Sequence, residues 1–487
     1  MKANIRKDLI TGILLLCAVI TEVFLIIWNI FALSDQINYV MYVLNYIVGG
    51  LIIINLMMKG ITEHFLAFAF FCTYMLFLMA QKPFEKYYNV YLTFVRVELD
   101  TRQYFCFSCI LFLGLSLTYY AYCFWSQRSR CLLKTDGELS LEDFQYLKPV
   151  LGILLSITLP CAVYMQGYIV MIRGSMEYTE GYLINVDIPA PIKVGYYVYT
   201  TVVLLYLALK PRPWQMVTVL STYLLIEGGF QLLQGRRALF ACTVLFVAWY
   251  LIKYYEINRI SFKFVISLGF IFILLLALFI LVEQSRDNAE TRLSFDMIRR
   301  FLISTGGSDS VIANTIFRKN DFPESGITYL LDPFVNNPLV NILLGKTSTA
   351  QGMAYLEQHH SFAHWISYMT ESSLYLSGHG MGSSYLAETY LAFGIPGIVI
   401  SSLLLGWVIN GINRLTFTEN IYRNAFIFYM VRRLFTLPRD GAFSWVDGLL
   451  YMLFSFILLY PFYARFCWQQ TEYRRGEREN NGARFKV

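Results

Sequence analysis

The stretch SGHGMGSSYLAETYLAFGIPG, residues 377–397, contains a histidine and a glutamate that can take part in acid–base chemistry. His379 can accept a proton near neutral pH without special tuning. Glu388 lies on an expected helix, where it serves either as a base for a hydroxyl group or as a partner that orients an arginine. The alternatives are a structural salt bridge for Glu388 and a loop-capping hydrogen bond for His379.

Arginines occur in two short segments between apolar runs. QGRRALF, residues 234–240, places Arg236 and Arg237 in a turn at the membrane boundary, where charge is costly. Planar guanidinium groups match phosphate oxygens bidentately, so these arginines suit a phosphate-bearing partner. RRLFTLPRDGAFSW is the second segment, with Arg432, Arg433, Arg439 and Asp440. The alternatives are contact with lipid headgroups for the first segment and internal pairing, such as Arg439 with Asp440, for the second.

The segment HHSFAH places His360 and His364 four residues apart, a spacing that can hold zinc on a helix. No HExxH motif, nearby cysteine or carboxylate at ligand spacing accompanies them, so we expect no metal. We expect this face to pack against the protein or to bind a sugar. Trp365, Tyr368 and Tyr375 nearby could stack on sugar rings.

These residues must be positioned by helices that cross a membrane. The chain has 487 residues, of which 57% are hydrophobic and 15% charged, and its mean hydropathy is +0.51. A span needs about 20 apolar residues. About twelve such runs occur, centred near residues 20, 48, 72, 114, 160, 201, 224, 246, 273, 402, 429 and 456. We therefore expect an all-α polytopic membrane protein, with its weakest span near residue 429.

The distribution of Lys and Arg sets the expected orientation. Once the one long loop is exempted, more of these residues lie on the side of the N-terminus, so we expect both termini in the cytoplasm. The expected organisation is nine spans in residues 1–282, a large periplasmic loop in 283–382, three spans in 383–466 and a basic cytoplasmic tail in 467–487. Such a tail suits anionic lipid rather than nucleic acid.

The long loop is expected to have a function, because loops of about 100 residues between spans are uncommon and usually functional. SFDMIRRFLIS and MAYLEQHHSFAHWISYM are typical of amphipathic helices, and GGSDS and KNDFPESG are typical of turns. No P-loop or dinucleotide fingerprint occurs, which excludes a pump with its own nucleotide domain. The predicted spans are nearly free of charge at their centres, which disfavours a flippase.

Many spans, one large outer loop late in the chain and outward arginines resemble the Wzy-type polymerases of O-antigen or capsule repeat units. These enzymes belong to a superfamily that also includes O-antigen ligases. The resemblance covers nearly the whole chain in architecture, but its sequence part is short. Its residues are Gly235, Arg236, Arg237, Gly382, Ser383, Ser384, Glu388, Gly394 and Gly397. Ligases often carry a His-Asn pair where this chain has Gly382-Ser383, which favours a polymerase.

The resemblance implies a GT-C-like fold and a glycan transfer at the periplasmic face of the bacterial inner membrane. The glycan would pass from undecaprenyl pyrophosphate to the non-reducing-end hydroxyl of another lipid-linked unit. Four arginines would bind the pyrophosphate, namely Arg236, Arg237, Arg432 and Arg439, and His379 or Glu388 would assist the acceptor. The residues expected to bind acceptor sugars are His360, His364, Ser383, Ser384 and Tyr385.

The resemblance implies neither a cofactor nor a metal. The expected partners are lipid-linked oligosaccharide, membrane lipid and a co-polymerase that regulates chain length. Three alternatives stay open at this point. They are an O-antigen ligase that transfers glycan to lipid A-core, another multispanning glycosyltransferase, and a lipid-linked oligosaccharide flippase.

Overall fold

The protein is helical throughout the part of the chain that the structure describes. This computed structural model describes residues 2–80, 99–128, 147–174, 183, 188–257, 305–337, 351–414, 417, 420–461 and 464. These ranges contain no β-strand. The expected all-α class is therefore confirmed for them, because apolar runs of this length satisfy their backbone groups in lipid only as helices.

Eight helices in the described ranges are long and apolar enough to cross a membrane. They are Leu9–Phe31 of α1 (Lys2–Phe31), α2 (Asp35–Gly60), Thr101–Ser126 of α5 (Thr101–Arg128), Leu147–Ile172 of α6 (Leu147–Gly174), α8 (Ala190–Ala208), Pro213–Leu233, α11 (Arg237–Tyr254) and α20 (Tyr385–Arg414). The span Pro213–Leu233 consists of α9 (Pro213–Leu224), a π-helical turn (Leu225–Gly229) and α10 (Phe230–Leu233). These eight match eight of the expected runs.

The other four expected spans have different outcomes. The runs near residues 72 and 456 form shorter apolar helices, α3 (Phe65–Leu78) and Val446–Pro461. The run near residue 429 forms α21 (Ile421–Thr436), which has only 16 residues and carries arginines. The run near residue 273 lies outside the described residues. A total of twelve spans, the orientation and the domain boundaries thus stay predictions.

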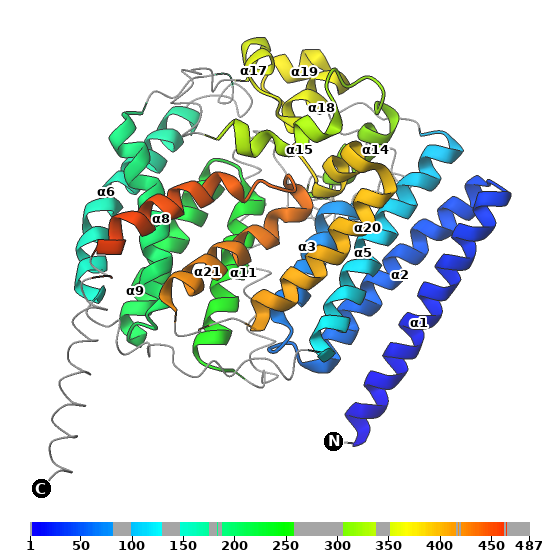
Figure 1. Ribbon diagram of the computed structural model, residues 1–487, viewed down its shortest axis with the longest axis horizontal. Coiled ribbons are helices and arrows are strands. Elements are labelled where there is room, and N and C mark those ends of the chain that lie inside the picture. Colours follow the sequence, from blue (N-terminus) through cyan, green and yellow to red (C-terminus); the bar gives the residue numbers. More distant parts are fainter. Residues whose placement is uncertain are drawn as a thin grey trace, which may run out of the picture.

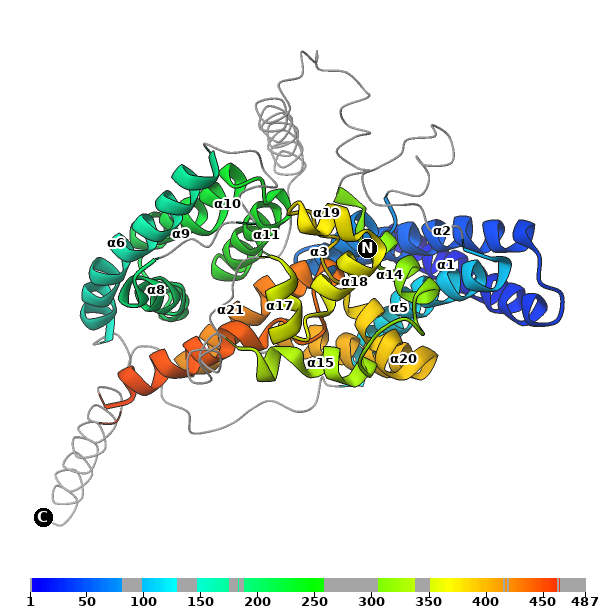
Figure 2. The same cartoon turned by 90° about the horizontal axis from the view of Figure 1, so that it is seen from above.

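The helices form two groups on either side of α3 and α21 (Figures 1 and 2). One group contains α6, α8, α9, α10 and α11, and the other contains α1, α2, α5 and α20. Shorter helices cover one end of the bundle, which we call the loop end, and the N-terminus lies at the opposite end (Figure 1). These helices are α14 (Ser308–Phe317), α15 (Gly326–Val335), α17 (Met353–Gln358), α18 (Phe362–Thr370) and α19 (Ser372–Leu376).

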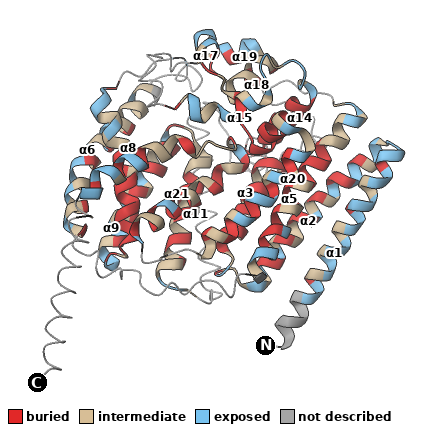
Figure 3. Cartoon of the chain, viewed as in Figure 1, coloured by how far each residue is buried: buried red, intermediate tan, exposed pale blue. Residues whose placement is uncertain are grey.

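Asparagines tie α2 to α5 inside the bundle. Asn38 donates a hydrogen bond to the Thr101 carbonyl at 2.8 Å, and Asn45 donates to the Ser108 carbonyl at 3.2 Å. Tyr119 donates to Asn55 Oδ1 at 2.7 Å. Lipid offers no hydrophobic drive for helix association, so such polar contacts and close packing hold membrane helices together. By contrast, only 6% of the apolar window of α1 is buried, and this helix lies at the edge of the molecule with much of its surface exposed (Figure 3).

The loop helices attach to the bundle mainly through α20. A Cβ at Gly326, the first residue of α15, would lie 2.4 Å from the carbonyl group of Leu391. Only glycine therefore lets the start of α15 rest directly on the backbone of α20. Stacked rings of Phe322 and Phe362, 5.8 Å apart, and a hydrogen bond from Thr370 to Asn314 join the loop helices to one another.

The structure corrects the expected helices and turns of the loop in two places. The segment 353–369 is not one helix, because His359 has extended backbone angles and α18 begins only after Ser361. The segment GGSDS is only partly a turn, since α14 begins within it at Ser308. The expected turn KNDFPESG is confirmed up to Gly326, where α15 begins. The segment SFDMIRRFLIS lies outside the described residues.

We expect Gly406→Ala to destabilise the protein, because α5 and α20 meet at this glycine. A Cβ at Gly406 would lie 2.3 Å from the Thr118 carbonyl oxygen, and overpacking of this kind costs about 1–3 kcal/mol. The measurement is thermal unfolding of the purified protein in detergent. Gly411→Ala on the same helix is the control, since a Cβ there meets nothing within 4 Å. Equal unfolding temperatures for the two variants would contradict the packing described here.

Candidate active site

The Glu388 carboxylate joins the start of α20 to the turn that follows α21. The Ser383 hydroxyl donates to its Oε1 at 2.7 Å, and the Ala442 amide donates to its Oε2 at 2.8 Å. The side chain is buried, with 6% exposed. A Cβ at Gly441 would lie 2.6 Å from Oε1, so this position must be glycine for the turn to reach the carboxylate. Both oxygens are occupied, which fixes the carboxylate in place.

Two glycines with left-handed backbone angles bound the segment that carries Glu388. Gly382 has φ 80° before it, and Gly394 has φ 65° after it. Residues other than glycine adopt such angles at a cost. α20 therefore breaks at Gly394, and the helical turns from Tyr385 to Phe393 form a short unit with their own direction. The sequence predicted this helix but not the break within the span.

Arg432 and Arg433 point to different partners although they are adjacent on α21. Arg432 Nη2 lies 2.6 Å from Glu227 Oε2, and its Nη1 donates to the Tyr223 hydroxyl at 3.1 Å. Arg433 Nε donates to the Tyr429 hydroxyl at 3.1 Å, and its Nη1 lies 3.8 Å from Asp440 Oδ2. Internal pairing, the alternative for this segment, is thus found for Arg432 with Glu227 and for Arg433 with Asp440.

Glu227 is a residue that the sequence reasoning missed. It lies 2% exposed in the π-helical turn of the Pro213–Leu233 span. The Thr200 hydroxyl donates to its Oε1 at 2.9 Å, and Arg432 binds its Oε2. The expectation of spans nearly free of charge at their centres is thus wrong here, and also at Glu22, which is fully buried in α1. The signal was present as a lone glutamate before two glycines in LIEGG.

Arg236 and Arg237 lie in the turn between α10 and α11, as the sequence predicted. Gly235 has φ 79°, and the Arg236 amide donates to the Gln231 carbonyl at 2.8 Å. Arg237 is the first residue of α11, and both arginines are half-buried. α11 packs against α21, the helix that carries Arg432 and Arg433.

Asp332 of α15 adds a further carboxylate at the loop end. The His360 amide donates to its Oδ1 at 3.1 Å, and the Asn336 side chain donates to the same oxygen. Partial burial raises the pKa of Asp332 above its ordinary value. Asp332 and Asp440 thus both lie within electrostatic range of Glu388.

His360 and His364 do not share a helical face. His360 lies before α18, where its backbone amide is held by Asp332, whereas His364 lies within α18. The zinc-like spacing is therefore not realised. Among the described residues, no three His, Cys, Asp or Glu side chains gather as metal ligands would, and independence from metal stays a prediction.

His364 is held in an aromatic cluster of the loop. Its Nδ1 lies 3.0 Å from the Tyr375 hydroxyl, and the Tyr355 ring packs 4.2 Å from its ring centre. The Tyr355 ring also packs 4.3 Å from His359. Burial lowers the pKa of His364 to about 4, so its ring is neutral at pH 7. A neutral ring packed among aromatic rings suits contact with a sugar or with protein rather than binding of an anion.

His379 is half-buried between α19 and α20. Its Nδ1 lies 3.0 Å from the Ser377 hydroxyl, and its carbonyl accepts a hydrogen bond from Gln351 at 2.7 Å. The Glu388 oxygens are bound by Ser383 and Ala442. The choice between the two candidate bases stays open.

The side chains of Ser383, Ser384 and Tyr385 are buried. Ser384 is fully buried, Tyr385 is 2% exposed, and the Ser383 hydroxyl donates its hydrogen bond to Glu388. Their expected contact with an acceptor sugar stays a prediction, and their burial favours a structural part at the start of α20.

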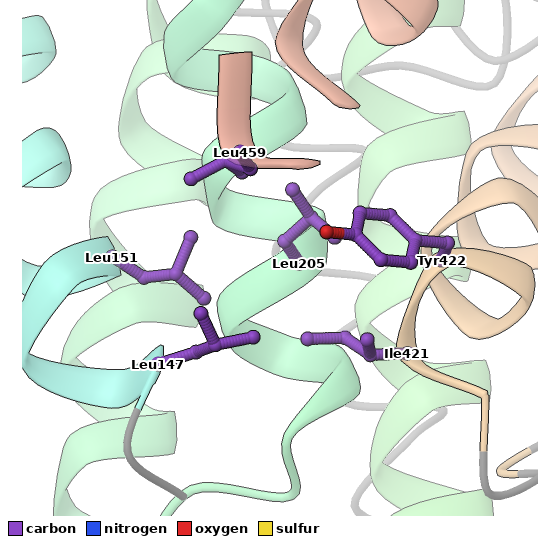
Figure 4. Close-up of a pocket in the computed structure, with 6 residues that line it drawn as sticks. All are labelled: Leu147, Leu151, Leu205, Ile421, Tyr422 and Leu459. Carbon is purple, nitrogen blue, oxygen red and sulfur yellow. The ribbon is translucent and has the colours of Figure 1, made fainter. Parts of the chain in front are cut away.

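A small apolar pocket lies away from these residues. Its lining is Leu147, Leu151, Leu205, Ile421, Tyr422 and Leu459 (Figure 4). These residues come from the starts of α6 and α21, from α8 and from the helix Val446–Pro461. The pocket has no charged lining residue, so it is not part of the candidate site.

A family model described as O-antigen polysaccharide polymerase Wzy matches residues 13–471. This match covers nearly the whole chain, including α20 and both arginine segments. The chain belongs to this family. No curated protein and no solved structure matches it, so the GT-C-like fold stays a prediction.

Membership of the Wzy family gives the protein a general activity. It is a glycosyltransferase-type polymerase that acts on lipid-linked oligosaccharide repeat units, and its long apolar helices make it an integral membrane protein. The expected resemblance is thereby confirmed. The carboxylates and arginines at the loop end then become candidates for the polymerase site.

We expect Glu388→Ala to destabilise this polymerase more than Glu388→Gln. Alanine leaves the Ala442 amide without an acceptor, which costs about 1–3 kcal/mol for a buried donor, whereas a glutamine amide can bond both partners. Thermal unfolding of the purified variants measures the difference. Glu324→Ala, at an exposed position, should leave the unfolding temperature unchanged. Equal loss in both Glu388 variants would show that charge, not hydrogen bonding, is what matters.

We expect His364 to make stability depend on pH. Its folded pKa is about 4, below the usual 6.5, so the unfolded chain binds more protons between these values. Stability should therefore be complete above pH 6.5 and fall as the pH drops toward 4. The measurement is the unfolding temperature from pH 4 to 7, which should fall less steeply in His364→Gln than in wild type. His379→Gln is the control, and a His364→Gln profile parallel to that of wild type would count against the assignment.

Proposed function

We propose that this Wzy-family polymerase extends glycans on undecaprenyl pyrophosphate at the periplasmic face of the bacterial inner membrane. The growing glycan passes from its lipid pyrophosphate to the non-reducing-end hydroxyl of an incoming lipid-linked unit. The family match over residues 13–471 carries this proposal. Placement of the loop helices at the end of the bundle opposite the N-terminus supports a site on that side (Figure 1).

Arginines near the loop end suit the charge that develops in this reaction. The leaving group is a pyrophosphate at the membrane surface, and preorganised cations stabilise such charge without a metal. Arg236 and Arg237 at the start of α11 and Arg439 in the turn after α21 are the arginines proposed to bind it. Arg432 forms a salt bridge with Glu227 at 2.6 Å. We propose that this pair stabilises the site from within the bundle.

The acceptor hydroxyl needs a group that takes its proton. His379 and Glu388 are the two candidates, one half-buried in the loop and the other buried at the start of α20. The half-buried rings of Tyr355 and His364 are proposed to contact acceptor sugars, and the fully buried Tyr375 to orient His364 through its hydroxyl. A co-polymerase that regulates chain length is proposed as a partner.

The buried Glu227–Arg432 pair bears on the flippase alternative. A flippase is expected to carry charges within its spans, and this pair is such a feature. However, the two members of this pair make their other hydrogen bonds with Thr200 and Tyr223 of the bundle. The family match also favours the polymerase. A ligase would accept lipid A-core rather than a second lipid-linked unit.

Deletion of the gene in its host, followed by gel analysis of the surface polysaccharide, tests the function. A polymerase predicts that the ladder collapses to core plus one repeat unit. Complete loss of attached glycan with lipid-linked polymer outside would indicate a ligase, and single units held inside would indicate a flippase. Complementation with Arg236→Ala or Arg237→Ala should lower polymer yield at least about 10-fold.

The matched control for these variants is Arg212→Ala. Arg212 is an exposed arginine just before α9, at the opposite end of the span Pro213–Leu233 from Arg236. It should restore the full ladder. If Arg236→Ala restored it equally well, the pyrophosphate assignment would be lost while the polymerase function stood.

A further inference from the structure

The Arg433 guanidinium has two terminal nitrogens that donate no hydrogen bond within the described structure. Within the described structure its only hydrogen bond runs from Nε to Tyr429, and Asp440 lies 3.8 Å from Nη1, too far for a hydrogen bond. Its side chain is 31% exposed, against 18% for Arg432. The terminal nitrogens of this guanidinium thus remain able to bind two oxygens of a phosphate group.

Arg432 does not have this freedom. It binds Glu227 at 2.6 Å and Tyr223 at 3.1 Å, and the Tyr223 ring lies 5.7 Å from its guanidinium. Removing Arg432 from Glu227 would leave a buried carboxylate unpaired inside the bundle, which is strongly unfavourable. A substrate therefore cannot readily recruit Arg432.

The Glu227–Arg432 pair sets the direction of Arg433. Adjacent residues on an α-helix point about 100° apart, so a fixed Arg432 fixes the rotation of α21 and the side from which Arg433 leaves it. Tyr429, which holds Arg433 Nε, donates to the Trp445 carbonyl at 2.6 Å. A Cβ at Gly448 would clash with the Tyr429 hydroxyl, so Tyr429 packs directly against the backbone at this glycine.

Arg433 faces the carboxylates that surround the Glu388 turn. Its charge acts on Asp447 as well as on Asp440. The Asp440 carboxylate is 35% exposed and also accepts the Gly441 amide. An anion with more charge than a carboxylate can displace this long contact at little cost, because Asp440 keeps its bond to the turn.

We propose that Glu227, through Arg432, is a positioning residue that directs Arg433 toward the Glu388 turn, where Arg433 binds the pyrophosphate of the lipid-linked donor. This inference rests on the proposed function and extends it, since the sequence analysis missed Glu227 and did not count Arg433 among the four arginines expected to bind pyrophosphate. The π-helical turn that carries Glu227 contributes by turning the carboxylate toward Thr200 and α21.

The test is binding of inorganic pyrophosphate to the full-length protein in nanodiscs, measured through the shift in unfolding temperature. Arg433→Ala should raise the Kd at least 10-fold, and Arg433→Lys should raise it less, since lysine keeps the charge but not the two-nitrogen geometry. The double variant Glu227→Gln/Arg432→Gln removes the pair without leaving a lone charge. It should also raise the Kd at least 10-fold, and Arg433→Lys should make little further difference in that background.

Three results would overturn the inference. They are a wild-type Kd in Arg433→Ala, a wild-type Kd in a double variant with the wild-type unfolding temperature, and a double variant that fails to fold, which would make the pair a folding requirement only. Arg212→Ala is the control and should bind as wild type does. Extension of lipid-linked units by the wild-type protein, assayed in parallel, tests the proposed function separately. If the wild type polymerises but these variants bind pyrophosphate as it does, only the role of Arg433 and Glu227 is contradicted.

Discussion

The Glu388 carboxylate accepts two hydrogen bonds in a place from which water is nearly excluded, and this constraint organises the loop end of the molecule. A buried carboxylate must find donors, and Ser383 and the Ala442 amide are the two that it has. The bonds join the start of α20 to the turn after α21. Gly441 and Asp440 therefore take their positions from Glu388.

A second buried carboxylate, Glu227, likewise connects separate elements in the interior of the bundle. Its pair with Arg432 connects the helix group of α9 and α11 to α21, and α21 in turn carries the arginine that faces the Glu388 turn. The proposed site thus lies beside two buried glutamates whose partners lie on different helices. Membrane proteins keep such costly groups chiefly where function or specificity needs them.

The sequence predicted much of this fold and less of the site. Apolar runs of about 20 residues located eight spans because lipid imposes that length, and Gly235-Arg236-Arg237 marked a real turn. The sequence could not show that Arg432 pairs with a residue more than 200 positions away, since such pairing depends on tertiary packing. Periodicity also failed at His359, where a carboxylate on another helix holds the backbone of the next residue and interrupts the expected helix.

The break in α20 at Gly394 divides this helix into two parts with different mechanical attachments. The inner part is fixed by its contact with α5 at Gly406, where the two backbones nearly touch. The outer part is attached to α15, which rests on Leu391, and to the turn after α21 through the bonds of Glu388. It also packs on α5, where the Cys106 thiol lies 3.4 Å from the Tyr390 hydroxyl. A load that a bulky glycan places on α15 therefore reaches α5 on both sides of Gly394.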